Sequence, residues 1–139
     1  MQVRAPLPSE FEAVRAFLQA QGWAHRLVDA AWFAQLLSAS RAAVAFDGAQ
    51  VVGFARGVTD GLSNGYLSMV AVLPSHRRKG LGSELVRHVM GGDPEVTWVL
   101  RAERPGARDF FSRLGFGVSA DAMERRRVEP LPGPDAGAS

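Results

Sequence analysis

Apolar residues follow helical spacing in two stretches of the first forty positions. The first stretch begins at a Ser9-x-x-Glu12 capping box and ends at Gly22, with apolar residues three and four positions apart. The second stretch runs from about Asp29 to Ser38, and it is similarly apolar on one side. The pattern therefore predicts two amphipathic helices at the start of the chain.

The middle of the chain changes to patterns that are typical of strands. Residues 42–46 and 51–59 lie on either side of an Asp47-Gly48 turn signal, which predicts a hairpin. A third strand is predicted over residues 66–73. In the strand over 51–59, large residues alternate with small ones, so we expect a closely packed neighbour, such as a helix, against the small face formed by Gly53, Ala55 and Gly57.

Helices and strands continue to alternate after residue 73, so the chain as a whole predicts an α/β or α+β sandwich built on a mixed sheet. The later elements are a helix from Leu81 to Gly91-Gly92, a strand over 97–101, a helix over 105–114 and a closing hairpin of residues 116–118 and 123–128.

Length and composition predict one domain over residues 1–128, followed by a disordered tail at 129–139 that is rich in proline and glycine. No cysteine is present, which excludes disulfides and thiolate metal sites, and the three histidines lack metal-ligand spacing. No apolar run approaches the roughly 20 residues that span a bilayer. The first ten residues lack the apolar stretch of a signal peptide, so we expect a cytoplasmic protein without a membrane partner.

Charge is nearly balanced, with 16 Lys and Arg against 14 Asp and Glu. So small an excess does not by itself predict a nucleic-acid partner, and a nucleic-acid-binding module is the weakest alternative, recognisable by a steep salt dependence of affinity. The basic residues are concentrated at 77–79 and at 125–127. The second cluster lies in a strand-like segment and is predicted to form a solvated edge.

The most informative segment is MVAVLPSHRRKGLGSELVRHVM, residues 69–90. A strand stops at Pro74, a short basic loop follows, and two glycines open an amphipathic helix. The N–H groups at a helix start are unpaired and carry the positive end of the helix dipole, so this order predicts a phosphate or pyrophosphate site. Two alternatives stay open: the glycines could serve tight packing alone, and the arginines could be a solvated loop. No P-loop motif is present.

Two motifs in this order resemble the GNAT superfamily of N-acetyltransferases. The first is Val70-x-Val72-x-Pro74 followed by Arg77-x-x-Gly80-x-Gly82, and the second is Ala107-x-x-Phe110-Phe111-x-x-x-Gly115-Phe116. Residues 55–61 also resemble small bacterial members that acetylate small amines. The resemblance implies a mostly antiparallel central sheet with one splayed parallel strand pair, flanked by about four helices.

The resemblance also implies acetyl-CoA as cosubstrate and a primary amine, on a small molecule or a peptide, as acceptor. The amine would attack the thioester directly in a ternary complex, with the N–H of Val70 polarising the carbonyl. A homodimer is a further expectation. The positions implied to bind the cosubstrate are Met69, Val70, Ala71, Val72, Arg77, Arg78, Lys79, Gly80, Leu81, Gly82, Ser83, Arg104, Phe110 and Phe111.

The catalytic positions depart from the family pattern. Phe111 stands where the family often has the tyrosine that protonates the leaving thiolate, and Arg104 stands where an asparagine is common. The remaining candidates for proton transfer are Ser68 and Glu103. Weaker alternatives are the carboxylate of Asp60, the imidazole of His76 and the hydroxyl of Tyr66, the single tyrosine of the chain.

Aromatic residues near the first two helices leave two interpretations open. Trp23, Trp32 and Phe33 either line the acceptor side or belong to the core. Because Phe111 has no proton to give, an acyl-CoA-binding module without catalysis is the alternative to an active acetyltransferase.

Overall fold

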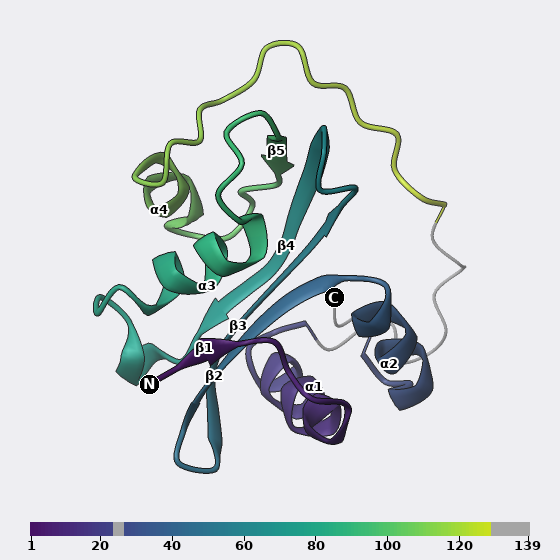
Figure 1. The fold of residues 1–139 in the computed structure, drawn as a ribbon, viewed down its shortest axis with the longest axis vertical. Coiled ribbons are helices and arrows are strands. Elements are labelled where there is room, and N and C mark those ends of the chain that lie inside the picture. The colour runs from purple at the N-terminus through teal and green to yellow at the C-terminus, as the bar shows by residue number, and fades with distance from the viewer. Residues whose placement is uncertain (24–26, 129–139) are drawn as a thin grey trace. The chain divides into compact units, whose positions relative to one another are not determined.

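The computed structural model describes residues 1–23 and 27–128, which form two compact units, Met1–Arg101 and the described part of Ala102–Ala138. The first unit contains a five-stranded sheet in the order β1-β2-β3-β4-β5 (Figure 1). Three strand pairs are antiparallel and β4–β5 is parallel, which confirms the predicted mixed sheet. The strands are β1 (Val3–Arg4), β2 (Arg41–Asp47), β3 (Gln50–Thr59), β4 (Asn64–Val72) and β5 (Thr97–Leu100). The predicted tail lies outside the described residues.

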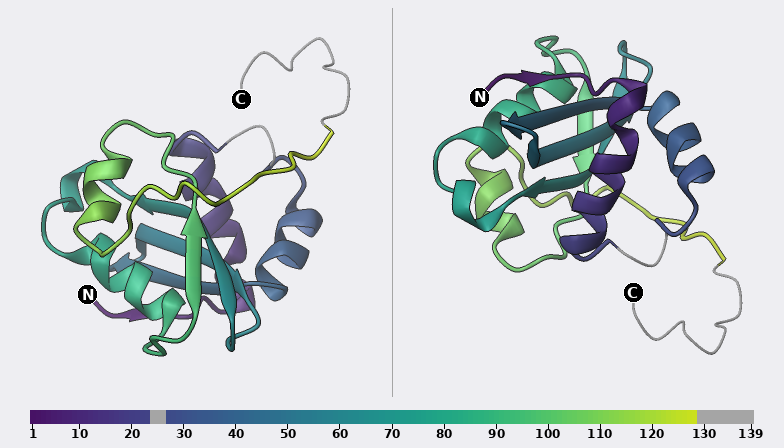
Figure 2. Two further views of the ribbon diagram at one scale, coloured as in Figure 1. Left: turned by 90° about the horizontal axis from the view of Figure 1, so that it is seen from above. Right: turned by 90° about the horizontal axis from the view of Figure 1, so that it is seen from below.

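Three helices of this unit cover the two faces of the sheet. Helices α1 (Phe11–Ala20) and α2 (Ala30–Ser38) lie on one face, and α3 (Leu81–Met90) lies on the other (Figures 1 and 2). These boundaries confirm the predicted helices to within a few residues. In the part of the chain that the structure describes, every helix is too short or too polar to cross a bilayer.

The start of α1 corrects one prediction. A 3₁₀ turn, η1 (Pro8–Glu10), precedes the helix, and the Leu7 N–H donates to the Glu10 carboxylate over 2.8 Å. The Ser9-x-x-Glu12 capping box is therefore wrong, because Glu10 takes the capping role and Glu12 instead pairs with Arg15. The short strand β1 was also missed, since two residues carry no readable alternation.

The face beneath α1 and α2 carries the main hydrophobic core. Large side chains from both helices meet large side chains of β2 and β3, and Phe33 and Phe54 are among the largest that are fully buried. The buried members of this core are Val14, Phe17, Leu18, Leu27, Phe33, Leu37, Ala42, Val44, Val51, Phe54 and Ala71.

The face beneath α3 is built from small residues, as the alternation in β3 predicts. A Cβ at Gly53 would lie 2.7 Å from Cδ1 of Leu85, and one at Gly57 would lie 2.6 Å from Cγ1 of Val89. The absence of side chains at these glycines lets α3 approach the sheet closely. The sequence prediction of a helix against this small face is confirmed.

The end of α3 is fixed by an arginine from the sheet. Arg41, the first residue of β2, donates from Nη1 to the carbonyl of Val89 over 3.0 Å and to that of Met90 over 3.4 Å. These carbonyls are among the last four of the helix, which have no partner within it. A cation at this end also complements the helix dipole, so Arg41 holds the axis of α3 against the sheet.

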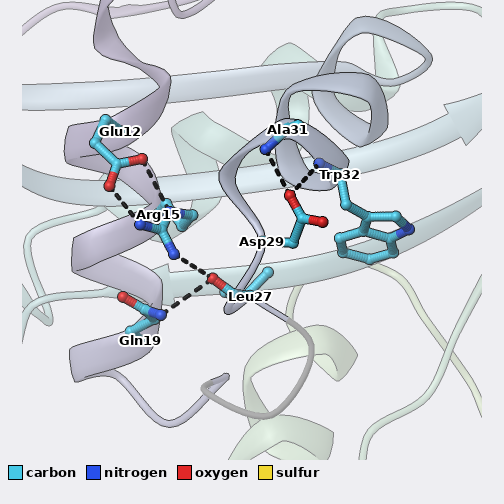
Figure 3. A network of polar contacts seen from close by, with 7 residues as sticks. All are labelled: Glu12, Arg15, Gln19, Leu27, Asp29, Ala31 and Trp32. Carbon is cyan, nitrogen blue, oxygen red and sulfur yellow. Dashed lines mark hydrogen bonds and ion pairs between the residues drawn. The ribbon is translucent and has the colours of Figure 1, made fainter.

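Residues 27–29, just before α2, are held by hydrogen bonds to both α1 and α2 (Figure 3). Arg15 and Gln19 of α1 both donate to the carbonyl of Leu27, a residue whose side chain is fully buried. Asp29 then caps α2 by accepting from the N–H groups of Ala31 and Trp32. The first two helices therefore form a braced layer rather than two independent elements.

The second unit contains the fourth helix of the described residues, α4 (Ala107–Ser112), which begins at Ala107 after the N-cap Gly106 rather than at Pro105. The closing hairpin predicted for residues 116–118 and 123–128 is wrong, because neither segment forms a strand. Val118, Met123 and Val128 are 86–98% exposed. They stand singly among polar residues, so pairing the two segments would bury too little apolar area to offset the cost of ordering them.

Candidate functional site

Strand β4 has a free edge over its second half. It pairs with β5 only from Asn64 to Leu67, where Leu67 lies opposite Leu100. Within residues 1–23 and 27–128, no strand continues the pairing on that side beyond Leu67. The main chain of β4 after this point is therefore open to an extended ligand that adds to the sheet edge.

A β-bulge lies at the point where this edge opens. On β3, Phe54 lies opposite Ala71 and Arg56 lies opposite Ser68, so Met69 and Val70 together oppose one residue. Met69 has φ of 55°, a left-handed conformation that is uncommon for a residue with a side chain. The bulge breaks the ladder and turns these two peptide groups away from regular pairing.

The loop after β4 contains two further left-handed residues. It begins with a 3₁₀ turn, η2 (Pro74–His76), and continues through Arg78 with φ of 62° and Gly80 with φ of 80°. Apart from its two chain neighbours, no described residue has an atom within 4 Å of the position that a Cβ would take at Gly80. The glycine is therefore required by its conformation, and packing against a helix is not the reason for it here.

Unpaired amides gather where this loop enters α3. The first bond of the helix runs from the Glu84 N–H to the Gly80 carbonyl over 3.1 Å. The N–H groups of residues 78–83 find no acceptor in the part of the chain described by the structure. Successive free amides at a left-handed turn and a helix start form a concave anion site, and the helix dipole favours negative charge there. A diphosphate fits this donor set.

The basic side chains of the loop differ in their surroundings. Arg77 donates from Nε to the carbonyl of Val72 over 2.9 Å, so it ties the loop to the end of β4. Arg78 and Lys79 are exposed. The charge of all three lies beside the free amides and adds to the attraction of an anion.

The candidates for proton transfer in the first unit have different surroundings. Ser68 is half-buried in β4, opposite Arg56, next to the bulge. The Asp60 carboxylate accepts from the Ser63 hydroxyl and from the N–H groups of Ser63 and Leu62, which hold its pKa well below its usual range. A carboxylate so stabilised in its charged form is a poor base, and Asp60 is a turn residue.

The candidates in the second unit form a separate set. Phe111 is buried, with its ring edge-on to those of Phe110 and Phe116 at centroid distances of 4.9 and 5.7 Å. Glu103 accepts from Arg126 over 3.0 Å in an exposed ion pair. The carbonyl of Arg104 accepts from the Ala107 N–H at the start of α4. Arg126 also pairs with Glu124, so the second basic cluster contains an ion-pair network and is not a strand edge.

Trp23, Trp32 and Phe33, which either line the acceptor side or belong to the core, differ in burial. Phe33 is 1% exposed and belongs to the core. Trp23 and Trp32 are partly buried and pack against that core, so each retains an exposed part.

The sequence did not predict the bulge at Met69 or the contact of Arg41 with the end of α3, since neither has a local pattern.

Comparison with known proteins identifies the family of this chain. The profile of the acetyltransferase (GNAT) domain matches residues 38–118, which include the open edge, the loop and α3. A search of curated proteins by sequence gave no match.

Solved structures of similar fold agree with the profile. A GNAT family acetyltransferase from Streptococcus pneumoniae TIGR4 is 28% identical with a TM-score of 0.71, over 92% of this chain and 96% of that one. A putative GNAT acetyltransferase from Xanthomonas campestris pv. campestris is 24% identical with a TM-score of 0.71, over 91% of this chain and 92% of that one. The aminoglycoside N-acetyltransferase AAC(6')-Iy, solved with CoA, is 22% identical with a TM-score of 0.71, over 91% of this chain and 93% of that one.

Proposed function

Because this chain belongs to the GNAT family of acetyltransferases, we propose that it transfers an acetyl group from acetyl-CoA to a primary amine. The acceptor is a small molecule or a peptide. The structurally similar aminoglycoside N-acetyltransferase, solved with CoA, supports both the cosubstrate and an amine acceptor.

The observation that carries this proposal is the continuous stretch of free main-chain groups from the β4 edge to the start of α3. The amides of residues 78–83 supply donors for the diphosphate, and the β4 edge after Leu67 supplies donors and acceptors for the pantetheine arm. Both belong to the same unit, and they are joined by a loop of a few residues.

The chemistry follows from this arrangement. The thioester supplies an activated acetyl group, and the Val70 N–H at the bulge polarises its carbonyl. The neutral amine attacks the carbonyl carbon, so that the C–N bond forms while the C–S bond breaks and the thiolate leaves. The amine proton passes to water or to Ser68 or Glu103, which we keep as the candidates for this transfer.

The absence of a tyrosine at position 111 does not remove the main source of rate. A positioned proton-transfer group contributes about 10²–10⁴-fold, whereas alignment of two reactants contributes about 7–11 kcal/mol. Because the groups that align the thioester are present, we expect an active enzyme of modest rate.

Calorimetric titration with CoA tests the proposal. We expect the wild-type chain to bind, and Gly82→Trp to abolish binding because an indole at the second helical residue blocks the approach to the free amides. Gly92→Trp is the matched control, since a Cβ at Gly92 meets nothing within 4 Å and the residue lies beyond the other end of α3. Equal CoA affinity in wild-type and Gly82→Trp would show that the loop is the wrong site.

An acyl-CoA-binding module without catalysis is the second candidate, and Phe111 is the observation that favours it. The test is release of free thiol from acetyl-CoA across a panel of amines, with the wild-type chain and with Phe111→Tyr. Turnover by the wild-type chain supports the enzyme. CoA binding without turnover for any amine, followed by turnover in Phe111→Tyr, supports the module.

A further inference from the structure

An imidazole ties the diphosphate loop to the neighbouring hairpin. The Nε2–H of His76 donates to the Asp47 carboxylate over 2.9 Å, and its Nδ1 lies 2.8 Å from the Ser75 hydroxyl. The His76 side chain is 15% exposed, so most of it is shielded from solvent. Both ring nitrogens are engaged, which leaves neither for a general base.

The two ends of this link belong to different parts of the sheet. His76 ends η2 and directly precedes Arg77, whereas Asp47 ends β2 and lies opposite Gln50 in the hairpin. The hairpin is an antiparallel pair whose register shifts between Ala45 and Phe46, and its last pair, Asp47 with Gln50, carries the link. Asp47 and the loop are 29 residues apart in the chain, so the link is made by the fold.

The link completes a set of anchors around the free amides. The Leu73 N–H donates to the Val52 carbonyl over 2.8 Å, and Arg77 Nε donates to Val72. These two bonds hold the loop to β3 and β4, and the His76–Asp47 bond holds it to the turn between β2 and β3. A loop fixed before the ligand arrives loses less conformational entropy on binding.

We infer that Asp47 is a positioning residue for the cosubstrate: through His76 it holds the loop of residues 77–83 in the conformation that receives the diphosphate. The inference rests on the proposed function. Asp47 itself touches neither the amides nor the anion. The Asp47 side chain is 60% exposed, and a bond to a solvent-exposed carboxylate contributes little to overall stability, so the effect of this pair is expected in the loop rather than in the melting temperature.

Three variants test the inference: Asp47→Ala, His76→Ala and the double variant. Because an exposed pair of this kind has a modest coupling energy, we expect CoA affinity to fall about two- to fivefold in each single variant. The double variant should lose no more than either single one, since both remove the same link. Asp93→Ala is the matched control, because the carboxylate of this aspartate accepts from the Glu95 N–H within its own turn.

A second measurement separates loop position from the stability of the whole fold. Amide hydrogen exchange at His76 and Arg77, whose N–H groups bond to the carbonyls of Leu73 and Pro74 just before the free amides, should be faster in Asp47→Ala than in wild type, with no change in α1 or in melting temperature. Unchanged exchange and unchanged CoA affinity in Asp47→Ala, with wild type binding CoA, would overturn this inference alone. Failure of the wild-type chain to bind CoA would overturn the proposed function and the cosubstrate role of Asp47 with it.

Discussion

The two faces of the sheet are packed in opposite ways. Beneath α1 and α2, aromatic and aliphatic side chains of Phe54, Phe33 and their neighbours fill the space between helix and strand. Beneath α3, Gly53 and Gly57 leave the strand bare, and leucine and valine of the helix rest directly on it. The first face supplies hydrophobic burial, whereas the second sets the position of a helix whose first turn carries the proposed diphosphate site. A change on the first face should therefore affect stability alone, and one on the second should affect both stability and binding.

Phe54→Ala is the largest test of this comparison. Loss of a fully buried phenylalanine leaves a cavity and is expected to lower the free energy of unfolding by about 3–5 kcal/mol. We expect CoA affinity, measured by calorimetry at low temperature where the variant is folded, to stay within about twofold of wild type because α3 is untouched. A large loss of affinity in the folded variant would contradict the separation of the two faces. Unfolding by urea gives the stability.

Gly57→Ala tests the opposite face. The new Cβ would lie 2.6 Å from Cγ1 of Val89 and 3.1 Å from the Trp98 ring. The side chain of Val89 is β-branched and cannot rotate away freely. We expect a loss of about 1–3 kcal/mol in unfolding free energy together with weaker CoA binding, since α3 must shift.

Gly53→Ala sharpens the same test. Its Cβ would meet the end of Leu85, a more flexible side chain, so the loss should be smaller than for Gly57→Ala. Gly92→Ala, with open space around it, is the control. Equal stability of the Gly57→Ala and Gly92→Ala variants would show that α3 is not closely packed. Urea unfolding and CoA calorimetry are the measurements.

The smallest effect is expected outside both faces, at the pair between Arg4 of β1 and Glu10. Hydrogen bonds from Arg4, and then from the Leu7 N–H, lower the pKa of Glu10 to about 2 from a usual 4.5. The stabilisation is therefore complete above pH 4.5 and is lost as the pH falls through about 2. Glu10→Gln should lower the melting temperature slightly at neutral pH, with the difference from wild type shrinking over that acidic range. A constant difference across this range would contradict the link to Glu10 ionisation.

Patterns of local origin were readable from the sequence. The glycines of β3, the apolar positions of α2 and the strand–loop–helix order at 69–90 each depend on neighbours within a few positions, and each predicted its element. The small residues on one face of β3 also predicted that a helix packs against that face, and this helix is α3.

Features made by distant contacts were not readable. The bulge at Met69 arises from the register between β3 and β4, and the partners of Arg41 and His76 lie 48 and 29 residues away. The closing hairpin failed for a related reason: residues 123–128 carry apolar side chains only at their two ends, and only the fold decides whether a partner strand is available. The proposed site thus combines a readable loop with supports that only the structure shows.

The additional residue in β4 has a consequence for redesign of this chain. A procedure that favours ideal strands would delete Met69 or replace its left-handed backbone, because a regular ladder opposite Ala55 is more favourable as a sheet. The product would have a more regular sheet, but the main-chain N–H and C=O groups of β4 at that edge would point in other directions. Attempts to thermostabilise the chain should therefore leave this irregularity alone and seek gains on the aromatic side of the sheet.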